Sequence, residues 1–207
     1  MTVPWPLATA YTQVGDAGAV AIGNGLQNLA QLQQITLNFY HTQVGDAGAV
    51  AIGNNTLQKK LQQITLNFIG TRVGDDGAVA IGNNLQNLKK LQQITLGFAC
   101  TRVGNDGAVA IGNNLQNLEL LQQITLNFRS TRVGNDGAVA IGNSLQNLKQ
   151  LQLNFYMTGV SAKTKESVRK QLTKPGVQLT DHTVFHAIGL RKLVMTVPWP
   201  LATTCRT

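Results

Sequence analysis

Glycine pairs recur along the chain in the pattern Val-Gly-x-x-Gly-Ala, which invites comparison with a phosphate-binding loop. Such a loop requires a fuller glycine spacing and usually a Lys followed by Ser or Thr. Here the first glycine is followed by Asp or Asn, as at Asp16, and a carboxylate at a helix N-terminus repels anions. We interpret these segments as turns that lead into helices.

The other candidates for chemistry lack partners in the sequence. Asn105-Asp106-Gly107 has no downstream Glu of a calcium loop, and His182 and His186 have no third metal ligand. Cys100 has no positioned His, and no Ser-His-Asp or paired-carboxylate arrangement can be assembled. We therefore expect no catalytic residue, no metal, no cofactor and no small-molecule substrate.

A repeated unit dominates the chain instead. The motif Thr-x-Val-Gly begins at Thr12, Thr42, Thr71, Thr101 and Thr131, so the spacings are 30, 29, 30 and 30 residues. A worn copy, Thr158-Gly159-Val160, follows after 27 residues. Self-similarity at such a period is typical of a solenoid, in which each copy needs its neighbours to bury its apolar face.

Two periodicities follow one another within each unit. Ile94, Leu96 and Phe98 alternate with polar or small residues, which predicts a strand with one buried face. One helix face is predicted at Ala108, Ile111, Gly112, Leu115 and Leu118. The units predict helices at about residues 17–29, 47–60, 77–90, 107–120 and 137–150, then a more charged helix over 162–172 and a strand near 177–179.

Three local roles follow from this assignment. The residue after the first glycine is expected to be the N-cap of its own helix, as Asp16, Asp46, Asp75, Asn105 and Asn135. Gly112 is expected to let its helix sit close to its strand. The lysines at 59–60, 89–90 and 149 are expected at helix C-termini, where positive charge suits the helix dipole.

The pattern Leu91-x-x-Ile94-x-Leu96-x-Phe98-x-x-Thr101-x-Val103-Gly104 with its following helix resembles leucine-rich repeats of the ribonuclease-inhibitor-like class. The resemblance implies an α/β fold, a right-handed horseshoe-shaped solenoid with parallel strands on the concave face and helices on the convex face. That family usually places Asn where this chain has Thr42, Thr71, Thr101 and Thr131. We expect the Thr hydroxyls to supply part of the bonding between neighbouring coils.

The expected organisation is one solenoid over residues 1–181 and a poorly ordered tail over 182–207. Alignment on the Thr-x-Val motif puts Trp5-Pro6-Leu7-Ala8-Thr9 in the first strand slot, where Pro6 suits an edge strand; the alternative is a disordered leader. The sequence MTVPWPLAT occurs twice, at 1–9 and at 195–203. This identity has no physical account.

Charge and cysteine content bear on partners and location. The net charge is +8, and residues 158–207 hold eight Lys or Arg against two Asp or Glu. A basic end can bind nucleic acid or an anionic membrane, although we expect a solvated cap. Cys100 and Cys205 show no paired spacing, and no signal peptide or membrane span is evident in the sequence. We therefore expect a cytoplasmic protein.

The surface that remains is the most promising place for function. Outward strand positions form nearly uniform columns of Gln, Thr and Asn, whereas the two residues after each strand differ from copy to copy. We predict a non-enzymatic scaffold that binds an unidentified protein partner through the concave face and this rim, at Asn38, Tyr40, His41, Asn67, Asn127, Arg129 and Tyr156. The alternatives are nucleic-acid or anionic-lipid binding through residues 163–192, small-GTPase regulation by fold analogy, and recent duplication with no selected ligand.

Overall fold

The computed structural model describes residues 14–56, 60–145, 148–172 and 178–179, in which helices and strands alternate. The helices are α1 (Asp16–Leu26), α2 (Asp46–Thr56), α3 (Asp75–Leu85), α4 (Asn105–Leu115), α5 (Asn135–Ser144) and α6 (Ala162–Leu172). The strands are β1 (Gln34–Asn38), β2 (Gln63–Asn67), β3 (Gln93–Gly97), β4 (Gln123–Asn127), β5 (Gln150–Asn154) and β6 (Gln178–Leu179).

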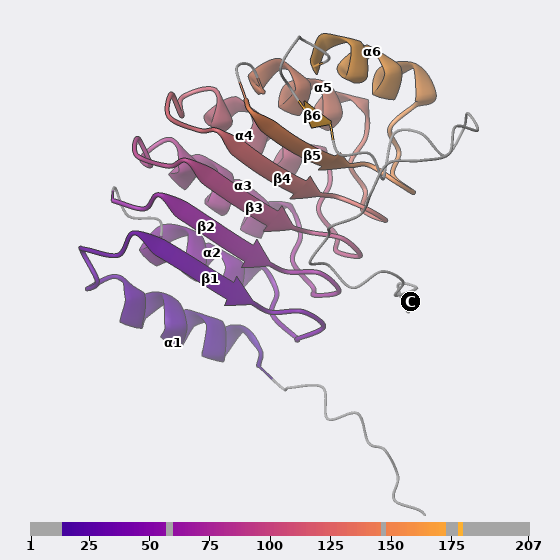
Figure 1. The fold of residues 1–207 in the computed structure, drawn as a ribbon. Coiled ribbons are helices and arrows are strands. Elements are labelled where there is room, and N and C mark those ends of the chain that lie inside the picture. The colour runs from indigo at the N-terminus through magenta and orange to yellow at the C-terminus, as the bar shows by residue number, and fades with distance from the viewer. Residues whose placement is uncertain (1–13, 57–59, 146–147, 173–177, 180–207) are drawn as a thin grey trace, which may run out of the picture.

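All six strands lie in one parallel sheet in chain order, β1-β2-β3-β4-β5-β6. Equivalent residues face each other across the sheet, so Thr36 pairs with Thr65 and Thr95 with Thr125. The helices cover one face of this sheet, and each strand–helix–strand connection is right-handed (Figure 1). The predicted α/β solenoid is confirmed. We use the word coil for one repeat unit of it, a strand together with the helix that follows.

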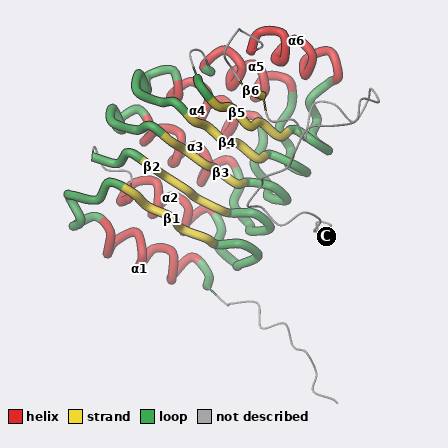
Figure 2. The backbone as a smooth tube through the Cα atoms, viewed as in Figure 1, coloured by secondary structure: helices red, strands yellow, loops and turns green. Residues whose placement is uncertain are grey.

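The helices end three to six residues earlier than the sequence predicted (Figure 2). After Leu85 the chain makes tight turns, in which the Leu88 N–H bonds the Leu85 carbonyl at 2.9 Å and the Leu91 N–H bonds the Leu88 carbonyl at 2.9 Å. Lys89 and Lys90 therefore lie beyond α3, and their predicted interaction with its dipole is wrong. Residue 150 begins β5 rather than ending a helix.

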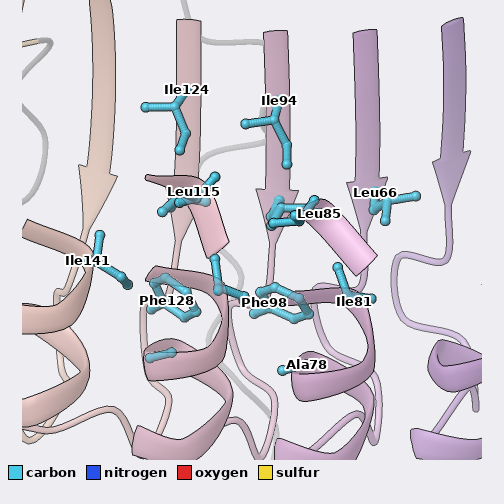
Figure 3. Packing of buried hydrophobic residues seen from close by; sticks show 14 of the residues in the cluster. Leu66, Ala78, Ile81, Leu85, Ile94, Phe98, Leu115, Ile124, Phe128 and Ile141 are labelled. Atoms are coloured by element: carbon cyan, nitrogen blue, oxygen red, sulfur yellow. The ribbon is translucent and has the colours of Figure 1, made fainter. Parts of the chain in front are cut away.

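The core lies between the sheet and the helices (Figure 3). Ile94, Leu96 and Phe98 point into it at 0–2% exposure, as the alternation predicted. A phenylalanine from each coil stacks on the next, with ring centroids 5.3 to 5.9 Å apart, through Phe39, Phe68, Phe98, Phe128 and Phe155. The predicted helix face is confirmed for Ala108, Ile111 and Leu115, which are buried. Leu118 is also buried, but it lies in the turn beyond the end of α4.

One glycine in each of α1 to α4 sets the distance to the next helix, rather than to the strand. A Cβ on Gly112 would lie 2.7 Å from the Ala140 carbonyl carbon, and a Cβ on Gly82 would lie 2.7 Å from the Ala110 carbonyl carbon. Contacts this short to backbone atoms leave no room for any side chain. The role predicted for Gly112 is therefore wrong, because the glycine lets α4 and α5 approach each other.

The predicted N-caps act on the following helix instead of their own. Asp75 is the first residue of α3, and the N-cap of α3 is Gly74, which makes no side-chain cap bond. The Asp75 Oδ1 instead accepts hydrogen bonds from the Gly104 and Gly107 N–H groups, both at 2.8 Å, at the start of α4. The same pair of bonds is made by Asp16, Asp46 and Asn105. Each coil thus caps its successor.

Several predictions fall on residues outside the described part of the chain. They are the first strand slot at residues 5–9, the poorly ordered tail at 182–207, and His182 with His186. The predicted helix over 162–172 and the short terminal strand are confirmed as α6 and β6. The described helices include none long and apolar enough to cross a membrane.

Candidate functional site

The rim consists of the second and third residues after each of the strands β1 to β5: Tyr40–His41, Ile69–Gly70, Ala99–Cys100, Arg129–Ser130 and Tyr156–Met157. The second member of each pair has a positive φ, between 53° and 70°. The backbone N–H of this second residue donates to the carbonyl of the first residue in the next pair. The His41 N–H donates to the Ile69 carbonyl at 2.9 Å, and the Cys100 N–H donates to the Arg129 carbonyl at 2.9 Å. The backbone of the rim is therefore a continuous hydrogen-bonded ladder that connects all five pairs.

The asparagines at the strand ends accept hydrogen bonds from the backbone of the rim. The Asn38 Oδ1 accepts the Tyr40 N–H at 3.0 Å, and the Asn127 Oδ1 accepts the Arg129 N–H at 3.1 Å. Asn67 is only 5% exposed; it bonds the Ile69 N–H at 3.0 Å and donates to the Asn38 Oδ1 at 2.9 Å. These predicted contact residues thus hold the backbone turn. Asn154 makes the same bond and was missed, although it ends a strand in the same column.

The threonines at the positions where ribonuclease-inhibitor-like repeats usually have Asn bond within their own coil. The Thr101 hydroxyl donates to the Phe98 carbonyl at 2.6 Å, and Thr42, Thr71, Thr131 and Thr158 make the same local bond. The prediction that these hydroxyls supply part of the bonding between coils is therefore wrong. The Asp and Asn residues at the helix starts carry that bonding instead.

Two predicted site residues meet at the end of the rim next to β1. The rings of Tyr40 and His41 lie edge to face, with centroids 4.3 Å apart. The His41 imidazole lies over Gly70, where an added Cβ would be 2.7 Å from its Nδ1. The small residue in the neighbouring coil therefore makes the space for the ring. This end presents a half-buried aromatic pair.

The other end of the rim carries a cation. The Arg129 guanidinium carbon lies 5.5 Å from the centre of the Tyr156 ring, which attracts the positive charge. The buried Arg129 Nε has no hydrogen-bond partner. Beside this pair, the Ser130 hydroxyl approaches the Met157 sulfur at 3.8 Å, and Met157 is 64% exposed. Alignment of the copies on Thr-x-Val puts Arg129 and Tyr156 in the same slot, so the sequence held this signal.

Ala99 and Cys100 separate the two ends of the rim. Ala99 is buried, and Gly97 supplies no side chain to the asparagine column at this coil. Cys100 is half-buried and disulfide-bonded. The cysteine spacing in the sequence did not indicate this bond. The structure thus places Asn38, Tyr40, His41 and Asn67 at one end and Asn127, Arg129 and Tyr156 at the other.

The strand face beside the rim is polar and regular. The Gln63, Gln93 and Gln123 side chains form one half-exposed column, and Thr65, Thr95 and Thr125 form the next. Among the described residues no group of three or more His, Cys, Asp or Glu could hold a metal ion. The face offers hydrogen-bonding groups at the spacing of the strands, with the rim along one side of it.

Charge gathers on α6, away from the aromatic pair. Arg169 donates to the Glu166 carboxylate through Nε at 2.7 Å, and this hydrogen bond lowers the pKa of Glu166 below its ordinary 4.5. Partial burial acts in the opposite direction, and the charges of Arg169 and Lys170 add to the lowering. Two of the basic residues predicted to bind anions are thus engaged with Glu166 on their own helix.

No protein-family model and no curated protein matches this chain. The geometry alone supports a leucine-rich-repeat-like architecture of repeated helix–strand units with parallel strands.

Proposed function

We propose that this chain is a non-enzymatic protein–protein interaction module of the ribonuclease-inhibitor-like leucine-rich-repeat class. It binds a protein partner through the concave strand face and the adjoining rim. The proposal rests on one contrast: the supporting residues are nearly the same in every coil, whereas the rim side chains above them differ. A rigid frame that displays varied side chains suits recognition of a shaped partner.

Arg129 supports this proposal in chemical terms. Its side chain is held against Tyr156. A guanidinium group fixed in this way can donate charge-assisted hydrogen bonds to a partner's carboxylate or carbonyl oxygen. Tyr40 and His41 would then contact an apolar or aromatic part of the same partner. The two ends together would fix the partner's orientation along the rim.

The experiment compares two fourfold alanine variants in affinity capture followed by binding assays with purified partner. The rim variant replaces Tyr40, His41, Arg129 and Tyr156. The control variant replaces Lys90, Gln116, Glu119 and Leu120, which are exposed residues outside the rim. Loss of two or more hot-spot contacts should weaken binding by at least about 30-fold. Equal affinity of the rim variant and the unmodified chain would contradict the proposal.

The binding of nucleic acid or anionic lipid through residues 163–192 has less support. Only 163–172 and 178–179 of this range are described, and Arg169 and Lys170 there contact Glu166. Replacing Lys163 and Lys165 with Gln would leave that contact in place. Binding through this helix would then weaken and depend less on salt.

We propose the cytoplasm as the compartment, as the unpaired cysteine spacing suggested. The state of Cys100 tests this proposal, because reducing compartments keep thiols free, whereas Cys100 is disulfide-bonded in the structure. Alkylation of the chain inside cells, before lysis, followed by mass spectrometry of the Cys100 peptide distinguishes the two states. A labelled thiol supports the cytoplasm, and a peptide that is labelled only after reduction contradicts it.

A further inference from the structure

The face of the sheet turned away from the helices carries the same two polar side chains in each of the strands β1 to β4 (Figure 1). The first residue of each strand is a Gln and the third is a Thr, and no strand of the described sheet contains a charged residue. The strands pair in register, so the equivalent side chains form two columns across the sheet: Gln34, Gln63, Gln93 and Gln123, and Thr36, Thr65, Thr95 and Thr125.

The hydrogen-bonding groups of these two columns are unused. None of the eight side chains has a hydrogen-bond partner in the part of the chain that the structure describes, and all are half-buried or exposed. The asparagines in the next outward position differ, because Asn38 and Asn67 bond the rim backbone and each other. The Gln amides and Thr hydroxyls therefore remain as donors for a ligand.

A repeated and uncharged face favours a ligand that is itself uncharged and repeats at a matching interval. Phosphate groups of nucleic acid or lipid require cations, which these strands lack. Neighbouring strands lie about 4.8 Å apart, so equivalent donors recur at about 4.8 Å in adjacent coils and at about 9.6 Å in alternate coils. A polymer that lies across the strands must present its acceptors at one of these intervals.

The regular conformations of a polypeptide differ in this interval. Groups on one side of a β-strand recur every two residues, at about 6.8 Å, which matches neither value. An α-helix uses its carbonyls in its own hydrogen bonds. A polyproline II helix has three residues per turn and rises about 3.1 Å per residue, so carbonyls on one side recur at about 9.3 Å. This interval is close to two strand spacings, and these carbonyls make no internal hydrogen bonds.

We propose that the strand face binds a proline-rich segment of the partner in the polyproline II conformation, laid across the strands along the Gln and Thr columns. This inference rests on the proposed function and specifies the chemistry of the partner. The Gln amides and Thr hydroxyls donate to the carbonyls of the segment. Proline suits such a site because it has no N–H that would need an acceptor.

The size of the face sets the length of the segment. The five strands β1 to β5 span four intervals, or about 19 Å, which a polyproline II helix covers with about six residues. Gln150 and Gln152 of β5 continue the two columns, so donors are present along this whole span. Uniform columns do not fix the position of the segment along the face. The varied side chains of the rim supply that selection.

The test titrates isotope-labelled chain with end-capped proline peptides and follows the side-chain amide signals by NMR. Hexaproline should shift the signals of Gln63, Gln93 and Gln123. Its affinity should exceed that of triproline several-fold and be close to that of nonaproline, because about six residues fill the face. A Gly-Ser peptide of the same length is uncharged but has no preformed helix, and it should bind several-fold more weakly. Absence of these shifts, or equal affinity for the Gly-Ser peptide, would overturn the proposal.

Substitutions locate the donors. The triple variant Thr65→Val, Thr95→Val and Thr125→Val removes three hydroxyls and keeps the branched shape that suits a strand. It should bind hexaproline at least about fivefold more weakly, since each hydroxyl in use contributes about one hydrogen bond. The single variant Thr95→Val should show part of this loss and serves if the triple variant does not fold. Hexaproline affinity that is unchanged in both variants contradicts the proposed site.

The matched control replaces three exposed arginines of the same coils with glutamine: Arg72, Arg102 and Arg132. These residues lie outside the strands, so hexaproline affinity should not change. A loss in this control equal to that of the valine variant would contradict binding by the strand face.

This proposal and the proposed function fail in different ways. If the rim variant loses its captured partner while hexaproline does not bind the unmodified chain, protein binding stands and the polyproline segment is refuted. If hexaproline binds through the threonines while the rim variant keeps full affinity for its partner, the strand-face site stands and the role of the rim is refuted.

Discussion

The contact between α4 and α5 differs from the contact between α5 and α6. Gly112 lets the backbone of α5 approach α4, with 2.7 Å from an added Cβ to the Ala140 carbonyl carbon. At the equivalent Gly142, the nearest atom of α6 is a side-chain carbon, the Val168 Cγ1, at 3.1 Å. The inner helices therefore meet backbone to backbone, and α6 meets α5 through side chains.

The hydrogen bonds that cap the start of α5 also differ from those that cap the start of α6. Asn105 of α4 accepts bonds from two amides at the start of α5, whereas Asn135 of α5 accepts one, from Ser161, at 2.9 Å. The remaining acceptor for α6 is its own Ser161 hydroxyl, which takes the Thr164 N–H at 3.1 Å. A helix that caps itself can carry a different, charged sequence. Terminal repeats of solenoids need such a polar outer face.

The largest expected effect comes from adding a methyl group at the contact between α4 and α5. Gly112→Ala forces α4 and α5 apart and should lower the free energy of unfolding by about 1–3 kcal/mol. Gly142→Ala meets only the Val168 side chain, which can move, so its cost should be much smaller. Urea denaturation of both variants measures the difference. Equal losses would show that the two helix contacts are alike.

The second-largest effect is expected from removing the hydrogen bonds with which one coil caps the helix of the next. Asp75→Ala leaves the Gly104 and Gly107 N–H groups without their acceptor and should cost about 1–2 kcal/mol, as loss of a helix cap does. Asp75→Asn keeps the Oδ1 acceptor, which Asn105 already uses in the same way. Its unfolding free energy should stay near that of the unmodified chain. A large loss in the Asn variant would instead indicate a role for the carboxylate charge.

The cap of the last helix should matter less to the whole molecule. Ser161→Ala should cost about 1 kcal/mol, and the loss should fall on α6 because no later described helix depends on it. Hydrogen exchange should become faster at the first-turn amides of α6 and stay unchanged in α3 and α4. Faster exchange throughout would mean that α6 unfolds together with the inner coils.

The smallest effect is a pH dependence on α6. Glu166 has a lowered pKa because Arg169 donates hydrogen bonds to its carboxylate. A lowered folded-state pKa contributes stability above the ordinary value of 4.5, and this is lost as the pH falls through the folded value. Glu166→Gln should therefore reduce stability slightly at pH 7 and not well below pH 4.5. A difference that persists in acid would assign the effect to packing.

The sequence predicted the parts of the fold that depend on periodicity. Ile94, Leu96 and Phe98 and the face containing Ile111 repeat in every copy, so the pattern alone indicated the strand, the helix and their stacking. The helix ends were missed because Gln86, Asn87 and Leu88 contain no helix breaker. The turn there is imposed by the need to return to the sheet within one repeat.

The contacts between coils were harder to predict than those within a coil. Asp75 looked like a cap for the nearest helix, but its partners lie 29 and 32 residues away. The rim positions followed from alignment of the copies, and the prediction that a partner binds there stays untested. The structural use of Asn67 was missed because nothing in its own copy shows that Asn38 lies beside it.

The phenylalanine column bears on the curvature of the molecule. Neighbouring strands in a sheet lie about 4.8 Å apart, and packed helices lie roughly 8–10 Å apart. The stacked rings, 5.3 to 5.9 Å apart, sit between these two layers and have an intermediate spacing. Each coil is thus a wedge whose thickness the aromatic ring helps to set. Exchanging these rings for leucines would change that thickness, and with it how widely the inner face opens.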